Sequence, residues 1–164
     1  MFKIFALSKE FINIVCEIEN DSFGDPWSKQ LFAEAFDNPL SICIAAFEDH
    51  KIIGYLFAYD LGPEIQILNI AVKKSERRRN VATAMLEVIF KYAETGKAEE
   101  LTLEVRESNA GAVALYKKLG FKIDGVRKNY YKNPKEDAVL MSRGDPAWSP
   151  EKSNIRSPEK SKPI

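Results

Sequence analysis

The sequence predicts a single domain of mixed α/β (or α+β) class, in which a twisted sheet of about seven strands is flanked by about four helices. Two observations support this prediction. Strands and helices alternate in the middle of the chain, which implies a parallel component because parallel neighbours are joined by crossover helices. A two-stranded hairpin earlier in the chain adds antiparallel pairing, and the sheet is therefore mixed.

In the first half of the chain, apolar runs and cap residues predict two helices and four strands. Ser8 caps a helix that runs to about Asp21, because apolar residues recur there on one helical face. Ser28 caps a second helix to about Phe36, which the following Asn-Pro pair ends. The polar turn Glu48–Lys51 joins two β-rich runs into a hairpin. The strands predicted in this half are Phe2–Leu7, Ser41–Phe47, Ile52–Tyr59 and Glu64–Val72.

The second half is predicted to contain two helices and three strands. Apolar residues at i, i+3, i+4, i+7, i+8 and i+11 from Val81 predict a long amphipathic helix that ends near Gly96. A further helix runs from its Asn109 cap to Leu119, and Gly120 ends it. The strands predicted in this half are Leu101–Val105, Phe121–Val126 and Ala138–Ser142.

The C-terminal part of the chain differs in composition from the rest. Residues 143–164 contain four of the eight prolines and the repeat Ser-Pro-Glu-Lys-Ser twice. Such a segment buries too little apolar surface to offset the entropy lost on ordering. The domain is therefore expected to span residues 1–142, followed by a disordered tail; a docking segment is the alternative for this tail.

Composition argues against several function classes. Lysine plus arginine and aspartate plus glutamate each number 24, so the formal charge is zero, which disfavours a dedicated nucleic-acid binder. The single histidine, His50, disfavours a histidine-rich metal site and a serine–histidine–aspartate triad, and we expect no metal. Cys16 and Cys43 lack metal-ligand spacing and are expected to be buried thiols in a reducing cytosol. The N-terminal apolar stretch is too short for a signal peptide and no segment approaches a membrane span, which predicts a cytoplasmic protein.

A basic loop lies between a predicted strand and the longest predicted helix. Five of the seven residues from Lys73 to Arg79 are basic. A helix N-terminus presents free backbone N–H groups, and arginines add charge-assisted hydrogen bonds to phosphate. The junction therefore favours a phosphate site, although a solvated charged loop explains the composition alone equally well.

This region resembles motif A of the GCN5-related N-acetyltransferase (GNAT) superfamily, Arg/Gln-x-x-Gly-x-Gly/Ala, in the stretch Asn69–Val72 followed by Arg77–Ala82. Asn80 replaces the family's glycine. Because asparagine adopts the left-handed backbone conformation more readily than most residues, we expect acetyl-CoA binding that is weakened rather than abolished. The resemblance implies that acetyl-CoA, as co-substrate, is bound by Ile70, Ala71, Val72, Arg77, Arg78, Arg79, Asn80, Val81, Ala82, Thr83 and Asn109.

Further motifs resemble the RimI-type branch of this superfamily, the ribosomal-protein-alanine N-acetyltransferases. They are Leu103–Asn109, Ala114–Phe121, Phe23-x-x-Pro26-Trp27-Ser28 and Arg127–Tyr131, and the resemblance extends from about Leu7 to Met141. It implies acetylation of the α-amino group of an alanine-starting small-subunit ribosomal protein. Phe23, Trp27, Tyr130 and Tyr131 are candidates for the walls of an acceptor groove; core packing explains Trp27 better than the tandem tyrosines, because adjacent strand residues face opposite ways.

Two residues are candidates for proton transfer. Acetyl transfer requires a neutral amine and a protonated leaving thiolate. Glu104 alternates on its strand with apolar Leu103 and Val105, and a carboxylate there can accept the amine's proton. The phenol of Tyr116, with an ordinary pKa of about 10, suits a proton donor. The sequence alone equally allows a surface glutamate and a core-edge tyrosine; the resemblance implies that Glu104 is the general base and Tyr116 the general acid.

Two alternatives to this function remain open at this stage. The same fold can acetylate a lysine side chain or a small-molecule amine, although a lysine amine with a pKa of about 10.4 demands more of the base. A non-catalytic CoA-sensing or ribosome-binding module is the second alternative, supported only by Asn80. We expect a monomer or weak dimer that binds neither nucleic acid nor a membrane.

Overall fold

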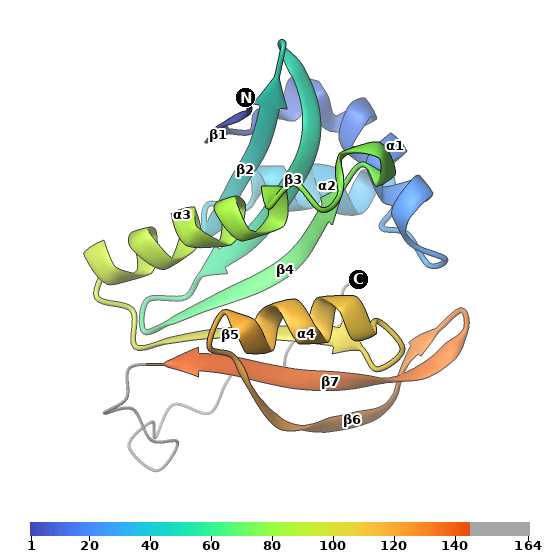
Figure 1. The fold of residues 1–164 in the computed structure, drawn as a ribbon, viewed down its shortest axis with the longest axis vertical. Coiled ribbons are helices and arrows are strands. Elements are labelled where there is room, and N and C mark those ends of the chain that lie inside the picture. Colours follow the sequence, from blue (N-terminus) through green and yellow to red (C-terminus); the bar gives the residue numbers. More distant parts are fainter. Residues whose placement is uncertain (145–164) are drawn as a thin grey trace.

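The computed structural model describes residues 1–144, which form one twisted seven-stranded sheet with helices on both faces (Figure 1). The strand order is β1-β2-β3-β4-β5-β7-β6. The strands are β1 (Lys3–Ala6), β2 (Ser41–Glu48), β3 (Lys51–Asp60), β4 (Glu64–Val72), β5 (Glu100–Arg106), β6 (Lys122–Lys132) and β7 (Lys135–Gly144). The helices are α1 (Ile12–Ser22), α2 (Lys29–Asp37), α3 (Val81–Thr95) and α4 (Ala110–Lys118), with 3-10 turns at Lys9–Phe11 and Lys74–Glu76.

The two faces of the sheet carry separate hydrophobic clusters. Helices α1 and α2 pack on one face, where Val15, Phe32 and Tyr55 are fully buried. Helices α3 and α4 cover the other, where Met85 and Ile89 of α3 are fully buried. Part of the helical face predicted from Val81 onward thus forms the stripe of α3 that packs against the sheet.

The short pairing of β4 with β5 leaves an opening in the sheet, at which the candidate site lies. These strands are parallel and pair only from Glu64↔Glu100 to Ile67↔Leu103. The register of β4 with β3 skips Leu68, and such a bulge bends a strand. Beyond it the two strands diverge, as Figure 1 shows. The carboxyl ends of parallel strands in an open sheet are where ligands usually bind.

The predicted element order and mixed class are confirmed, with some local differences. The prediction that Ser8 caps the first helix was wrong, because a 3-10 turn precedes α1 and the Ser8 hydroxyl donates to Glu10 instead. Ser28 does cap α2, by accepting from the Leu31 N–H at 3.1 Å. Cys16 and Cys43 are half-buried free thiols rather than fully buried ones.

The C-terminal hairpin is longer than predicted. Strand β6 continues past Val126, and β7 begins before Ala138. The pattern was misleading because β6 is an edge strand whose side chains are mostly exposed, so pairing there needs no apolar alternation. Arg143 and Gly144, assigned to the tail, belong to β7; the rest of the expected tail, 145–164, lies outside the described residues.

Two further observations concern membrane spanning and metal binding. Within residues 1–144 the helices are all too short or too polar to cross a membrane. The same residues contain no group of three or more histidine, cysteine, aspartate or glutamate side chains arranged to hold a metal ion.

Candidate active site

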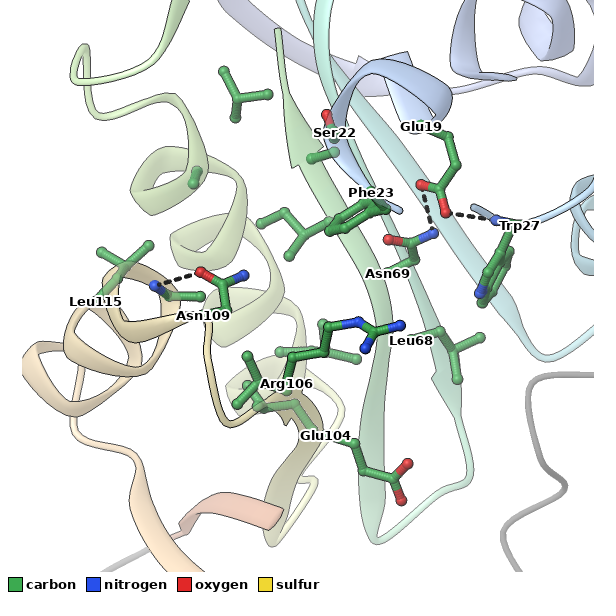
Figure 2. Close-up of a pocket in the computed structure, with 18 of the residues that line it drawn as sticks. Glu19, Ser22, Phe23, Trp27, Leu68, Asn69, Glu104, Arg106, Asn109 and Leu115 are labelled. Atoms are coloured by element: carbon green, nitrogen blue, oxygen red, sulfur yellow. Dashed lines mark hydrogen bonds between the residues drawn. The ribbon is translucent and has the colours of Figure 1, made fainter. Parts of the chain in front are cut away.

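An open cavity of about 850 Å³ lies where β4 and β5 diverge (Figure 2). Its walls come from α1, the α1–α2 loop, α2, the end of β3, β4, the basic loop, the start of α3, β5, α4 and β6. It brings together nearly all of the residues proposed from sequence: Phe23, Trp27, Ile70, Ala71, Val72, Arg77, Arg78, Asn80, Val81, Ala82, Thr83, Glu104, Asn109, Tyr116, Tyr130 and Tyr131.

The basic loop forms one end of this cavity. Arg78 and Asn80 have φ angles of 64° and 60°, so Asn80 adopts the left-handed conformation that the sequence argument allowed it. The first α3 hydrogen bond runs from the Ala84 N–H to the Asn80 carbonyl, and the Asn80 side chain makes no capping hydrogen bond. The N–H groups of the first turn of α3 are thus available to an anion, which the helix dipole also favours.

Arg77 and Arg79 have different roles in this loop. The Arg77 Nε donates to the Val72 carbonyl at 3.1 Å, which ties the loop to the end of β4. Arg79 does not reach the cavity. Its guanidinium binds Glu76 and, at 2.8 Å, Glu48 on the β2–β3 hairpin. The hydrogen bonds from Arg79, followed by that from the N-terminal amine, lower the pKa of Glu48 to about 2. We therefore assign Arg79 a part in anchoring the loop.

Strand β4 supplies the floor of the cavity. Ile70, Ala71 and Val72 line it, and they follow Ile67, the last β4 residue paired with β5. Their other edge pairs with β3. Backbone groups on the β5 side of β4 therefore face the gap, where an extended ligand can pair with them as an added strand does.

Glu104 lies on β5 among polar and aromatic side chains. Its side chain is 11% exposed, and a carboxylate oxygen is 3.6 Å from Nη1 of Arg127. The carboxylate also hydrogen-bonds Tyr130. Burial, followed by this interaction with Glu104, raises the pKa of Tyr130. The Glu104 carboxylate is thus held in place while its residue lines the cavity.

Tyr130 and Tyr131 both line the cavity, contrary to the alternation expected of adjacent strand residues. The β6–β7 register shifts between Arg127 and Tyr131, and Asn129 has a φ angle of 53°. This irregularity brings the two rings together edge to face, with centroids 5.0 Å apart. Burial, followed by the Glu104 charge, raises the pKa of Tyr131 to about 12.

Helix α4 contributes Tyr116 and Asn109. Tyr116 is buried and packs edge to face on Phe121 at 5.7 Å. Burial raises the pKa of Tyr116, so its phenol keeps its proton at neutral pH. The Asn109 Oδ1 accepts from the Ala112 N–H at 3.2 Å, as expected of a cap, while the residue also faces the cavity (Figure 2).

The sequence argument missed a buried carboxyl group, Glu19 on α1. It is 1% exposed, and it accepts hydrogen bonds from the Trp27 N–H at 2.8 Å, from Asn69 Nδ2 at 3.0 Å and from the Tyr55 hydroxyl. Burial raises the pKa of Glu19, and these hydrogen bonds oppose that shift. The signal that could have identified Glu19 from sequence is its position on the apolar stripe of α1, directly after Ile18.

A second missed residue is Arg106 at the end of β5. Its guanidinium is near Asp25 and Glu136 and stacks on Tyr131. Arg106 falls within the Leu103–Asn109 motif, but its contacts could not be predicted because these partners are far apart along the chain.

Comparisons with known proteins show the family of the chain. Residues 12–121 match the model of the acetyltransferase (GNAT) family. The ribosomal protein bS18-alanine N-acetyltransferase of Salmonella typhimurium is 33% identical over 145 residues, which cover 87% of this chain and 97% of that protein. The N-alpha-acetyltransferase RimI of Mycobacterium tuberculosis is 30% identical over 150 residues, covering 87% of this chain and 93% of that protein.

A solved structure shows the same fold. The crystal structure of the ribosomal-protein-S18-alanine N-acetyltransferase from Escherichia coli superimposes with a TM-score of 0.83 at 28% identity, covering 96% of this chain and 100% of that chain. The family match, the relatives aligned over nearly their whole length and this fold establish that the chain belongs to the acetyltransferase (GNAT) family.

Proposed function

We propose that the protein transfers the acetyl group of acetyl-CoA to the α-amino group of a protein that begins with alanine, with ribosomal protein bS18 as its acceptor. The observation that carries this proposal is the position of Glu104. Its carboxylate is held by Arg127 and Tyr130 in the cavity whose other end is the anion-binding loop. The names of the relatives supply the acceptor.

In this proposal the two substrates enter the cavity from different sides. The first turn of α3, with Arg77 and Arg78, binds the pyrophosphate of acetyl-CoA, and the free edge of β4 pairs with its pantetheine arm. The acceptor N-terminus lies among Phe23, Trp27 and the tandem tyrosines. Holding both reactants in one cavity supplies proximity and orientation.

The reaction then needs protons to move at both substrates. Glu104 accepts a proton from the α-ammonium group, directly or through water, so that the amine nitrogen can attack the thioester carbonyl. A C–N bond forms, the C–S bond breaks, and Tyr116 donates its proton to the departing sulfur. The nitrogen loses its second proton as the amide forms, and this proton returns to the Tyr116 oxygen, directly or through water. Because an α-amino group has a pKa of about 7.7–8.0, about a tenth to a fifth of the acceptor molecules already carry a neutral amine at pH 7. Deprotonation by the general base is therefore less demanding than it is for a lysine amine.

The alternative of a non-catalytic CoA-binding module depended on Asn80. Asn80 adopts a positive φ angle, as glycine would, so asparagine at this position is compatible with the conformation of the loop. Acetylation of a lysine side chain or a small amine stays an alternative that the choice of acceptor tests.

Exchange of Glu104 for glutamine tests whether this carboxylate carries the chemistry. Glu104→Gln keeps the size and hydrogen-bonding capacity of the side chain but removes the base. We expect kcat on an alanine-starting peptide to fall by about 10²–10⁴-fold, with an unchanged Kd for acetyl-CoA by calorimetry. Equal turnover by both proteins would refute the assignment of Glu104 as general base.

A further inference from the structure

Arg106 extends into the cavity from the end of β5, and its side chain is only 17% exposed (Figure 2). We propose that Arg106 is a positioning residue that holds the α1–α2 loop, residues 23–28, against the end of the β6–β7 hairpin, residues 130–136. It thereby shapes the acceptor end of the cavity. The inference rests on the acetyltransferase function proposed above and adds a residue that sets acceptor affinity.

On the hairpin side, Arg106 makes several contacts at once. Nη1 is 3.1 Å from a carboxylate oxygen of Glu136 and donates to the Pro134 carbonyl at 3.1 Å. Nη2 donates to the Asn133 carbonyl at 3.4 Å. The guanidinium carbon lies 4.2 Å from the centroid of the Tyr131 ring. Because a guanidinium is planar and has five donors, it can serve a carboxylate, two carbonyls and an aromatic face together.

On the other side, the same guanidinium reaches the α1–α2 loop. Nη2 is 4.0 Å from a carboxylate oxygen of Asp25. The loop also passes close to the hairpin, since a Cβ added to Gly24 would lie 3.6 Å from the Asn133 carbonyl oxygen. That oxygen is the one that accepts from Arg106. The two segments therefore meet at Arg106.

Glu136 extends the arrangement to α4. It accepts from the Ser108 N–H, in the turn just before α4, and its side chain is 14% exposed. Hydrogen bonds from Ser108, followed by those from Arg106, lower the pKa of Glu136, so the ion pair persists at neutral pH. The hairpin is thereby joined both to β5 and to the helix that carries Tyr116.

These contacts join the two segments that carry the acceptor walls. Phe23 and Trp27 belong to one joined segment, and Tyr130 and Tyr131 to the other. The anion-binding loop and the β4 edge lie outside both. Loss of Arg106 should therefore weaken acceptor binding and leave acetyl-CoA binding unchanged.

The test compares three variants. Arg106→Met keeps most of the side-chain length but removes the charge and all donors. Arg106→Lys keeps the charge but loses the planar group. Lys128→Met is the matched control, because Lys128 is a cation on the same hairpin, 79% exposed and paired with Asp137 at 3.0 Å, and it does not line the cavity. The measurements are acetyl-CoA Kd, steady-state kinetics with an alanine-starting peptide, and hydrogen exchange of residues 23–28 and 130–136.

We expect Arg106→Met to raise the acceptor KM by about tenfold or more, with little change in kcat and none in acetyl-CoA Kd. Exchange should accelerate in both segments, Arg106→Lys should be intermediate, and Lys128→Met should match the parent. Unchanged acceptor KM and exchange in Arg106→Met, or a loss confined to kcat, would overturn the proposal. If Arg106→Met does not fold, the acceptor KM and the hydrogen exchange of Arg106→Lys decide instead. If the parent does not acetylate the peptide, the proposed function fails, whereas hydrogen exchange still decides whether Arg106 joins the two segments.

Discussion

At the scale of single residues, the two groups proposed for proton transfer have different surroundings. Glu104 is held by Arg127 and Tyr130, whereas Tyr116 is buried and remains neutral. A carboxylate and a phenol in different environments can act as base and acid at one pH.

The hydroxyl of Tyr116 can be removed without disturbing its ring. Tyr116→Phe is expected to lower kcat by about a hundredfold or more, because the thiolate then departs without a positioned proton donor. Tyr92→Phe is the control, since Tyr92 is exposed on α3 and its hydroxyl donates to Asp60 at the end of β3. Acetyl transfer measured by release of free CoA would separate the two variants. Equal kcat values in parent and Tyr116→Phe would exclude Tyr116 as general acid.

Glu19 gives a prediction about stability and pH. Burial raises its pKa above that of the unfolded chain, so its contribution to stability is complete below a pH of about 4.5 and declines as pH rises through the folded-state pKa. Glu19→Gln removes this titration and leaves an amide oxygen that can accept from Trp27. The free energy of unfolding in urea, measured from pH 4.5 to 8, should therefore fall less steeply in the variant. Parallel curves for the two proteins would contradict the buried-carboxyl account.

At the scale of elements, the loop before α3 depends on residues with positive φ. Asn80→Val places a β-branched side chain at a φ angle of 60°, which costs about 1–2 kcal/mol. We expect acetyl-CoA Kd to rise by about tenfold or more, because the loop must reach the same conformation to bind. Lys97→Val is the control, since Lys97 has a φ angle of 57° but lies after α3 and outside the cavity. Calorimetry should show weakened acetyl-CoA binding only for Asn80→Val, and unchanged binding there would contradict the role of the loop.

Elements with strong periodicity were predicted well from sequence. Strand β4 has its predicted bounds, and α3 begins at Val81 as its apolar spacing required. The positive φ of Asn80 was anticipated because few other residues adopt it. These features depend on local sequence, which records helix periods, caps and backbone preferences.

Features set by distant contacts were not predictable in the same way. The hairpin β6–β7 extends through Arg127–Lys132 because edge pairing tolerates polar residues on both faces. Tyr130 and Tyr131 share the cavity only because the register shifts there. Glu19 has a partner 50 residues away, and Arg106 contacts Glu136, 30 residues away, and the still more distant Asp25; no local pattern records such pairings.

At the scale of the whole molecule, the same sheet supports the hydrophobic core and forms the cavity. Its two faces bury separate hydrophobic clusters, while the divergence of β4 and β5 leaves a cavity between them. The bulge at Leu68 and the short parallel pairing thus open the sheet at the candidate site. The groups proposed to bind the pyrophosphate lie on the side of β4 and α3, and the aromatic residues proposed as acceptor walls lie on the side of β6 and the α1–α2 loop.

The measurement that tests the central claim most directly is acetyl-CoA turnover with a panel of short peptides. The panel begins with alanine, serine, methionine or acetyl-alanine, with free lysine as a further acceptor. We predict turnover of the alanine peptide, with none of acetyl-alanine and little of lysine, because the site acts on a free α-amino group. Turnover of lysine alone, or of no acceptor despite acetyl-CoA binding, would contradict the account.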